Sequence, residues 1–244
     1  MKSILVIGET CKDIFVYCNA IRLAPDLPVP VLEVESMTEN PGMAMNVQRN
    51  IQGISEECDL FTNEDWQQVT KTRYMHSSTN HMFIRIDTPH VIPRIDFNRV
   101  NLEYSMIVIS DYDKGFLTKE DIYEISSQHP LVFLDTKKPL GDWAENCRYI
   151  KINDYEFQRS RPFLNENLEK KIIHTKGGEG AFFQGEHFTV KKVEVRDASG
   201  AGDAFMAALT VKYLETLDIR ASIEYANTCA SKVVSEKGVT TLTK

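Results

Sequence analysis

The sequence predicts an α/β fold with a mostly parallel sheet, and three apolar runs carry this prediction. Residues 4–7, 106–109 and 131–134 are apolar at consecutive positions, which is typical of strands covered on both faces. Between the second and third runs, residues 118–127 have the pattern of a helix with Thr118 as its N-cap. A strand, a helix and a strand at this spacing indicate a βαβ unit.

Other segments alternate apolar and polar residues, which predicts strands with one exposed face. They lie at residues 13–18, 29–35, 70–76 and 81–87. We expect them to form a small β lid, from about 11–35 and 70–97, over the carboxyl edge of the main sheet. Further helices are expected at residues 43–51, 201–216 and 220–236. Because no repeat or long linker divides the 244 residues, we expect one domain over residues 1–244.

Composition excludes several classes of protein. Lys and Arg number 28 against 35 for Asp and Glu, and a net charge of −7 argues against a nucleic-acid partner. The five Cys are odd in number and include no Cys-x-x-Cys pair, which argues against a disulfide framework or a zinc site. No signal-peptide pattern and no run of ~20 apolar residues is present. We therefore expect a reduced, cytoplasmic protein with no membrane partner.

The segment Asp197-Ala-Ser-Gly-Ala-Gly-Asp203 directly precedes a helical pattern. Its glycines allow a backbone to approach a ligand closely, and a helix start presents unpaired N–H groups. Two interpretations are open: an anion site, or a plain helix start that Asp203 stabilises. Common phosphate motifs do not fit, because a dinucleotide fingerprint needs Gly where Phe205 stands, and the nearest approach to a Walker A loop continues with Glu186.

Four segments together resemble the ribokinase (phosphofructokinase B) family of sugar kinases. Asp197 to Asp203 resembles its Asp-Thr-x-Gly-Ala-Gly-Asp signature, and Asn153-Asp-Tyr-Glu156 matches its Asn-x-x-Glu motif. His174 to Gly180 and Pro41 to Asn46 resemble its nucleotide turn and its sugar signature. The resemblance covers nearly the whole chain. It implies a ribokinase-like α/β/α sandwich with a β lid, and an ATP-dependent carbohydrate kinase that uses Mg²⁺.

Within the family, the chain resembles the D-glycero-β-D-manno-heptose 7-phosphate kinases. The segments that suggest this are Leu27 to Val31, Thr72 to Tyr74, Arg85 to Asp87, Ser110 to Gly115 and Asp135 to Pro139. The implied acceptor is the anomeric hydroxyl of the heptose 7-phosphate. The implied partners are a small sugar or sugar phosphate and, through the lid, a second copy of the chain.

The resemblance also assigns roles to individual residues. Asp203 is the expected general base, and the N–H groups of Gly200, Ala201 and Gly202 are expected to stabilise the transferring phosphoryl group. Asn153 and Glu156 are expected to bind the nucleotide and to place Mg²⁺ through water. From the residues alone, a capping box at a helix start is favoured for these two.

The remaining candidates divide into a nucleotide set and an acceptor set. Nucleotide binding is expected from Lys176, Gly177, Gly178, Gly180 and Asn227. Acceptor binding is expected from Asp13, Gly42, Asn46, Asp111 and Lys114. Arg85, Lys114 and Lys138 are further candidates for an acceptor phosphate. Polar turn residues and solvated cations explain the same positions without any ligand.

Three positions depart from the family pattern. Glu9 follows Gly8 where the family usually has Asp, and Met43 replaces the second Gly of the sugar signature. The segment from residue 54 to 71 is about half the usual length, so we expect one strand–helix unit fewer than in typical members. Three alternatives follow: a kinase of another sugar or nucleoside, a catalytically weak binding protein, and a generic α/β protein with a well-capped helix.

Overall fold

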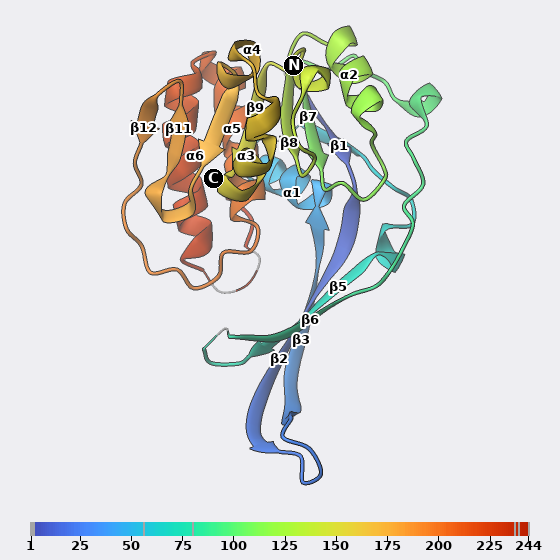
Figure 1. The fold of residues 1–244 in the computed structure, drawn as a ribbon, viewed down its shortest axis with the longest axis vertical. Helices are drawn as coiled ribbons and strands as arrows, with labels where there is room; N and C mark the ends of the chain where they lie inside the picture. The colour runs from blue at the N-terminus through green and yellow to red at the C-terminus, as the bar shows by residue number, and fades with distance from the viewer. Residues whose placement is uncertain (1–2, 56, 80, 237, 239, 244) are drawn as a thin grey trace.

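The computed structural model describes residues 3–55, 57–79, 81–236, 238 and 240–243, and in this part of the chain the strands form two sheets (Figure 1). The larger sheet has, in spatial order, β12 (Glu186–Phe188), β11 (Ala181–Phe183), β10 (Ile172–Thr175), β9 (Tyr149–Asn153), β8 (Val132–Thr136), β7 (Met106–Asp111), β1 (Ile4–Gly8) and β4 (Cys58–Phe61). The strands from β10 to β4 pair in parallel, and β11 and β12 add an antiparallel edge. This confirms the predicted mostly parallel sheet.

Helices cover both faces of this sheet, which gives three layers. One face carries α1 (Ala44–Ile54), α5 (Ala201–Thr216) and α6 (Ile219–Val234); the other carries α2 (Lys119–Gln128), α3 (Asp154–Ser160) and α4 (Glu166–Glu169). Alternate residues of one strand supply the two cores: Val6 packs with the first group of helices and Ile7 with the second. The runs are apolar at every position because each central strand contributes to both cores.

Local signals start the helices where the sequence predicts. Thr118 caps α2: its hydroxyl accepts from the backbone N–H of Asp121, whose carboxylate accepts from that of Thr118. The helix α5 follows Gly200, which has a φ of 81° in the left-handed region that favours glycine. Within the described residues, no helix is long and apolar enough to cross a membrane.

The second sheet is the predicted lid, with strand order β3 (Pro30–Met43), β2 (Thr10–Leu23), β5 (Thr70–His76) and β6 (Met82–Asp87). It extends away from the layered body (Figure 1). Two predicted boundaries were wrong. The first lid segment continues to Met43, because β3 pairs with β2 as far as Thr10. The second stops at Asp87, since Pro89 and Pro93 lack the amide hydrogen that a sheet ladder needs.

The strand β4 forms the edge of the main sheet beside β1. Residues 62–69, which join it to the lid, hold a short 3₁₀ turn at Trp66–Gln68 and no α-helix. This connection agrees with the short segment in the sequence, and the expectation of one unit fewer than in typical relatives stays a prediction.

Candidate active site

A cavity of about 790 Å³ lies where β8, β9 and β10 end and α5 begins. Its walls include every residue predicted to hold the nucleotide or the transferring phosphoryl group except two: they contain Asn153, Gly177, Gly178, Gly180, Gly200, Ala201, Gly202, Asp203 and Asn227. Lys176 and Glu156 are outside the lining. Lys176 instead lies 3.8 Å from Asp154 and over the ring of Phe182. The structure therefore gathers most of the predicted set from separate segments of the chain.

Glycine is required at one turn of this cavity and useful at others. Gly180 has a φ of 97°, and a Cβ there would lie 2.1 Å from the carbonyl oxygen of Phe188. A Cβ on Gly177 or Gly178 would meet nothing within 4 Å, so their backbone faces open space. At the start of α5, a Cβ on Gly202 would lie 3.0 Å from Nζ of Lys151. A buried cation thus adjoins the N–H groups of the helix start, and both favour an anion there.

Asp203 lies at this helix start and is 6% exposed. Its Oδ2 accepts a hydrogen bond from Nδ2 of Asn46 (2.7 Å), and its Oδ1 accepts one from the hydroxyl of Tyr112 (2.8 Å). Burial raises the pKa of Asp203 above its ordinary value, although both hydrogen bonds oppose the shift. A more basic carboxylate is a stronger acceptor for a proton, and Asn46 joins the predicted base to the predicted acceptor set.

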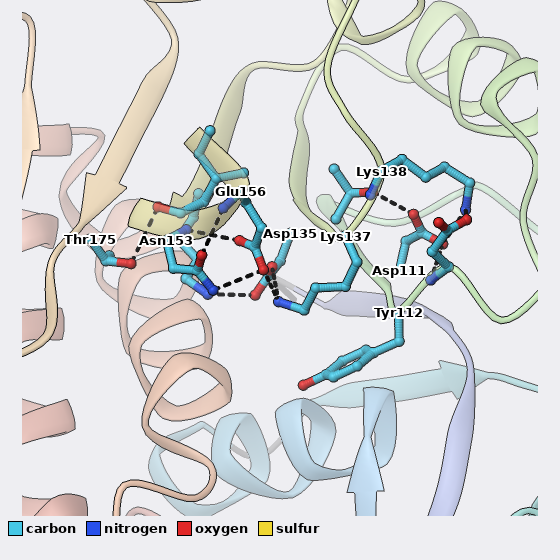
Figure 2. A network of polar contacts seen from close by, with 12 residues as sticks. Asp111, Tyr112, Asp135, Lys137, Lys138, Asn153, Glu156 and Thr175 are labelled. Carbon is cyan, nitrogen blue, oxygen red and sulfur yellow. Dashed lines mark hydrogen bonds and ion pairs between the residues drawn. The ribbon is translucent and has the colours of Figure 1, made fainter. Parts of the chain in front are cut away.

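Lysines and carboxylates form a polar network in the cavity, and Figure 2 shows Lys137 beside Asp135 and Glu156. Nζ of Lys151 donates to Asp135 (2.7 Å), and Lys137 donates to Glu156 and lies 3.6 Å from Asp135. Burial by itself would raise the pKa of Asp135, but the charges of Lys137 and Lys151 hold it below its ordinary value. Despite burial, Asp135 and Glu156 raise the pKa of Lys137. Two ammonium groups therefore lie beside the predicted anion site.

The capping-box interpretation of Asn153 and Glu156 holds in the structure. The Asn153 side chain accepts from the backbone N–H of Glu156, and the Glu156 carboxylate accepts from that of Asn153 (2.9 and 2.8 Å). Within the described residues, no group of three or more His, Cys, Asp or Glu is placed to hold a metal directly. In the same part of the chain, Oδ1 of Asp135 is buried without a hydrogen bond, but it lies 3.6 Å from Nζ of Lys137, so an ammonium group already offsets its charge. Asn153 and Glu156 bond to each other as a helix cap, and a role in placing Mg²⁺ through water stays a prediction.

The predicted acceptor residues divide into three places. Asn46 contacts Asp203, as described above. Asp13 pairs with Arg73 (2.5 Å), and a Cβ on Gly42 would lie 2.5 Å from the Asp13 carboxylate. Asp111 accepts from Lys138 (2.7 Å) and from the hydroxyl of Thr136.

The three predicted phosphate cations also differ in their surroundings. Lys138 binds Asp111 and Asp113, and Arg85 binds Asp87 through two hydrogen bonds of 2.7 and 2.6 Å. The side chain of Lys114 is exposed. The carboxylates beside Lys138 and Arg85 leave those cations less available to a phosphate than their sequence positions suggest.

Sequence reasoning gave no role to several residues that surround Asp203. Tyr112, Asp135, Lys137 and Lys151 all line the cavity. Glu9 is fully buried and accepts from the backbone N–H groups of Tyr112 and Lys114 (2.9 and 2.8 Å), which fixes the turn that carries Tyr112. The position of Asp135 and Lys137 in the sequence could have indicated a role in the site. Both follow an apolar run, and ligands bind at that edge of the sheet in open α/β folds.

Comparison with known proteins identifies the fold and the family of the chain. In structure, the chain is similar to a ribokinase from Thermotoga maritima, with a TM-score of 0.76 and 17% identity over 98% of this chain and 95% of that one. The predicted ribokinase-like α/β fold is confirmed. Residues 118–244 match the pfkB family carbohydrate kinases, so the chain belongs to this family and to the class of ATP-dependent carbohydrate kinases. The family recognised from the sequence motifs is thereby confirmed.

The sequences of two curated relatives align with nearly the whole of this chain. The bifunctional protein HldE of Helicobacter pylori (strain Shi470) is 26% identical over 295 aligned positions, and that of a Nitratiruptor species is 27% identical over 292. Each alignment covers 98% of this chain. The chain spans 64% and 63% of the lengths of these relatives.

Proposed function

We propose that this kinase transfers a phosphoryl group from ATP to the anomeric hydroxyl of D-glycero-D-manno-heptose 7-phosphate. One observation carries the catalytic part: Asp203 lies at the start of α5 and is bonded to Asn46, between the cavity and the acceptor residues. The choice of sugar rests on the sequence motifs of heptose 7-phosphate kinases and on the similarity to proteins named HldE. We further propose that residues 1–244 act as one domain.

In this proposal, different residues of the cavity have different roles. The glycine turn at residues 177–180 and Asn227 hold the nucleotide, and the N–H groups of residues 200–202 hold the transferring group. Lys137 and Lys151 stabilise the negative charge that accumulates there. Mg²⁺, held through water near Asn153 and Glu156, would supply additional charge neutralisation.

Asp203 takes the proton from the acceptor hydroxyl in this proposal. Its raised pKa suits the role, because a general base works best when its pKa approaches the operating pH. Asn46 and Tyr112 each donate to a different carboxylate oxygen, which fixes the plane of the carboxylate. Asp203 is therefore held in one orientation before the sugar binds.

A coupled assay of ADP release with a panel of sugars and sugar phosphates tests the proposal. We expect the heptose 7-phosphate to give the highest kcat/KM and a product phosphorylated at the anomeric position. Faster turnover of fructose, ribose or a nucleoside would identify a different acceptor within the same family. ATP or sugar binding without any phosphoryl transfer would instead indicate a binding protein.

A further inference from the structure

Lys71, on the lid strand β5, is a buried lysine that has no ion pair with a carboxylate among the described residues. It is 8% exposed, and its Nζ contacts Sδ of Met43 at 3.1 Å and lies 5.1 Å from the centre of the Tyr112 ring. Asp87, opposite Lys71 in the strand register, is held instead by Arg85.

The other lysines around Tyr112 are different. Lys138 contacts Asp111 at 2.7 Å, Lys151 contacts Asp135 at 2.7 Å, and Lys137 contacts Glu156. A buried ammonium ordinarily has such a partner, because removing a charge from water is costly. A thioether is a weak acceptor and leaves most of the three donors of Lys71 unused. Lys71 therefore supplies charge and hydrogen-bond donors that its described surroundings do not satisfy.

Met43, the contact of Lys71, has an unusual backbone. Its φ is 61° and its ψ is −132°, a conformation that side chains rarely adopt, and the residue is 3% exposed. Strained backbone of this kind persists where the surrounding structure enforces it, and it is concentrated at binding sites. Here the strain places the thioether on the ammonium of Lys71, just before Asn46 in the first turn of α1.

Lys71 is also close to the predicted chemistry. The Tyr112 ring that it faces donates its hydroxyl to Asp203, so one tyrosine side chain separates the ammonium from the proposed base. Lys137 lies 5.2 Å from the centre of the same ring and belongs to the nucleotide network. Lys71 is a second cation near this ring, and it comes from the lid.

We propose that Lys71 binds an anionic group of the acceptor, a phosphate or a carboxylate, and so makes the enzyme select acidic sugars over neutral ones. The inference deepens the proposed kinase function and rests on it. A bound anion replaces the thioether of Met43 as the partner of the ammonium, and a charge-assisted hydrogen bond replaces a weak one. The remote charge then positions the acceptor hydroxyl near Asp203.

Steady-state kinetics of Lys71→Met with paired acceptors test this role. The probes are heptose 7-phosphate and heptose, and mannose 6-phosphate, mannose and mannuronate. We expect KM for the phosphorylated acceptor to rise roughly tenfold or more, with kcat little changed and the neutral sugar unaffected. Lys71→Arg should restore much of the difference. Of mannose 6-phosphate and mannuronate, the acceptor with the lower KM identifies the preferred anion as phosphate or carboxylate.

Lys12→Met is the matched control, because Lys12 is a lid lysine that already pairs with Glu39 (3.3 Å). It should leave the preference for acidic acceptors unchanged. An equal rise in KM for acidic and neutral sugars, or no rise for either, would overturn the role of Lys71. If Lys71→Met does not fold, as judged by circular dichroism, Lys71→Gln carries the same comparison.

Calorimetric titration with mannose 6-phosphate in the absence of ATP separates the two proposals. If the parent protein binds mannose 6-phosphate but phosphorylates no sugar, and Lys71→Met weakens this binding, the anion site is supported and the kinase proposal is rejected. If the protein phosphorylates a sugar phosphate and Lys71→Met does not change the kinetics, the kinase proposal is supported and the anion site is rejected.

Discussion

The two sides of Asp203 are built on different principles. On the proposed nucleotide side, backbone N–H groups and glycine turns line the cavity, and Lys137 and Lys151 are each paired with a carboxylate. On the proposed acceptor side, the lid supplies Lys71, whose contact is the thioether of the strained Met43. Backbone groups suit the phosphates of ATP, which are the same whatever the acceptor. A side chain with unused donors can distinguish one acceptor from another. Three substitutions test this contrast, and a fourth tests the lid as a contact between two copies of the chain.

The largest effect is expected from Asp203→Asn, which affects both sides at once. The amide keeps the shape of the carboxylate but cannot take a proton, so turnover should fall by at least about a hundredfold. Circular dichroism and ATP affinity should stay near those of the parent protein. Asp197→Asn is the control, because Asp197 accepts from the backbone N–H of Ser199 and has no proposed proton to transfer. A near-parent rate for Asp203→Asn would refute the general-base role.

On the nucleotide side, Gly202→Val should weaken ATP binding. Its Cβ would stand 3.0 Å from Nζ of Lys151, at the helix start proposed to hold phosphate. We expect KM for ATP to rise roughly tenfold or more, equal to about 1.4 kcal/mol. Gly141→Ala is a suitable control, since its backbone is extended and lies outside the cavity lining. Unchanged ATP affinity in a folded Gly202→Val would move the phosphate site elsewhere.

Tyr112→Phe should shift the pH dependence of the reaction. The hydroxyl of Tyr112 lowers the pKa of Asp203, which burial raises, so its removal lets that pKa rise further. Because the base must be ionised, the acid limb of kcat/KM should lie above the ordinary pKa of Asp in the parent and move to higher pH in the variant. A pH–rate profile for each protein measures this. An identical acid limb in both would mean that the limb does not report Asp203.

The smallest effect on catalysis is expected at β6, an edge strand of the lid. Ile84 and Ile86 of β6 are each about half exposed, at 52% and 51%, and we propose that they contribute to a homodimer contact through the lid. Ile84→Asp should convert a dimer to a monomer in light scattering while kcat changes little. Tyr155→Asp, at an exposed aromatic position on α3, should leave the mass unchanged. A parent protein that is monomeric at high concentration would exclude the contact.

The elements that the sequence predicted well are those that short-range patterns specify. Consecutive apolar residues predicted β1, β7 and β8, and Thr118 predicted the start of α2. Asp197 to Asp203 predicted the start of α5, because Gly200 permits the left-handed turn before the helix. The anion site at the same segment stays a prediction.

Tertiary structure decided which of these residues act together. Asn46 and Asp203 are 157 residues apart and meet only because α1 packs against α5 on one face of the sheet. Arg85 and Lys138 look alike in the sequence as phosphate ligands, yet each is bound to a carboxylate, while Lys71 contacts a thioether. Arg85 is paired within its own strand with Asp87, but the partners of Lys138 and Lys71 come from other elements, and no local pattern of residues records those partners.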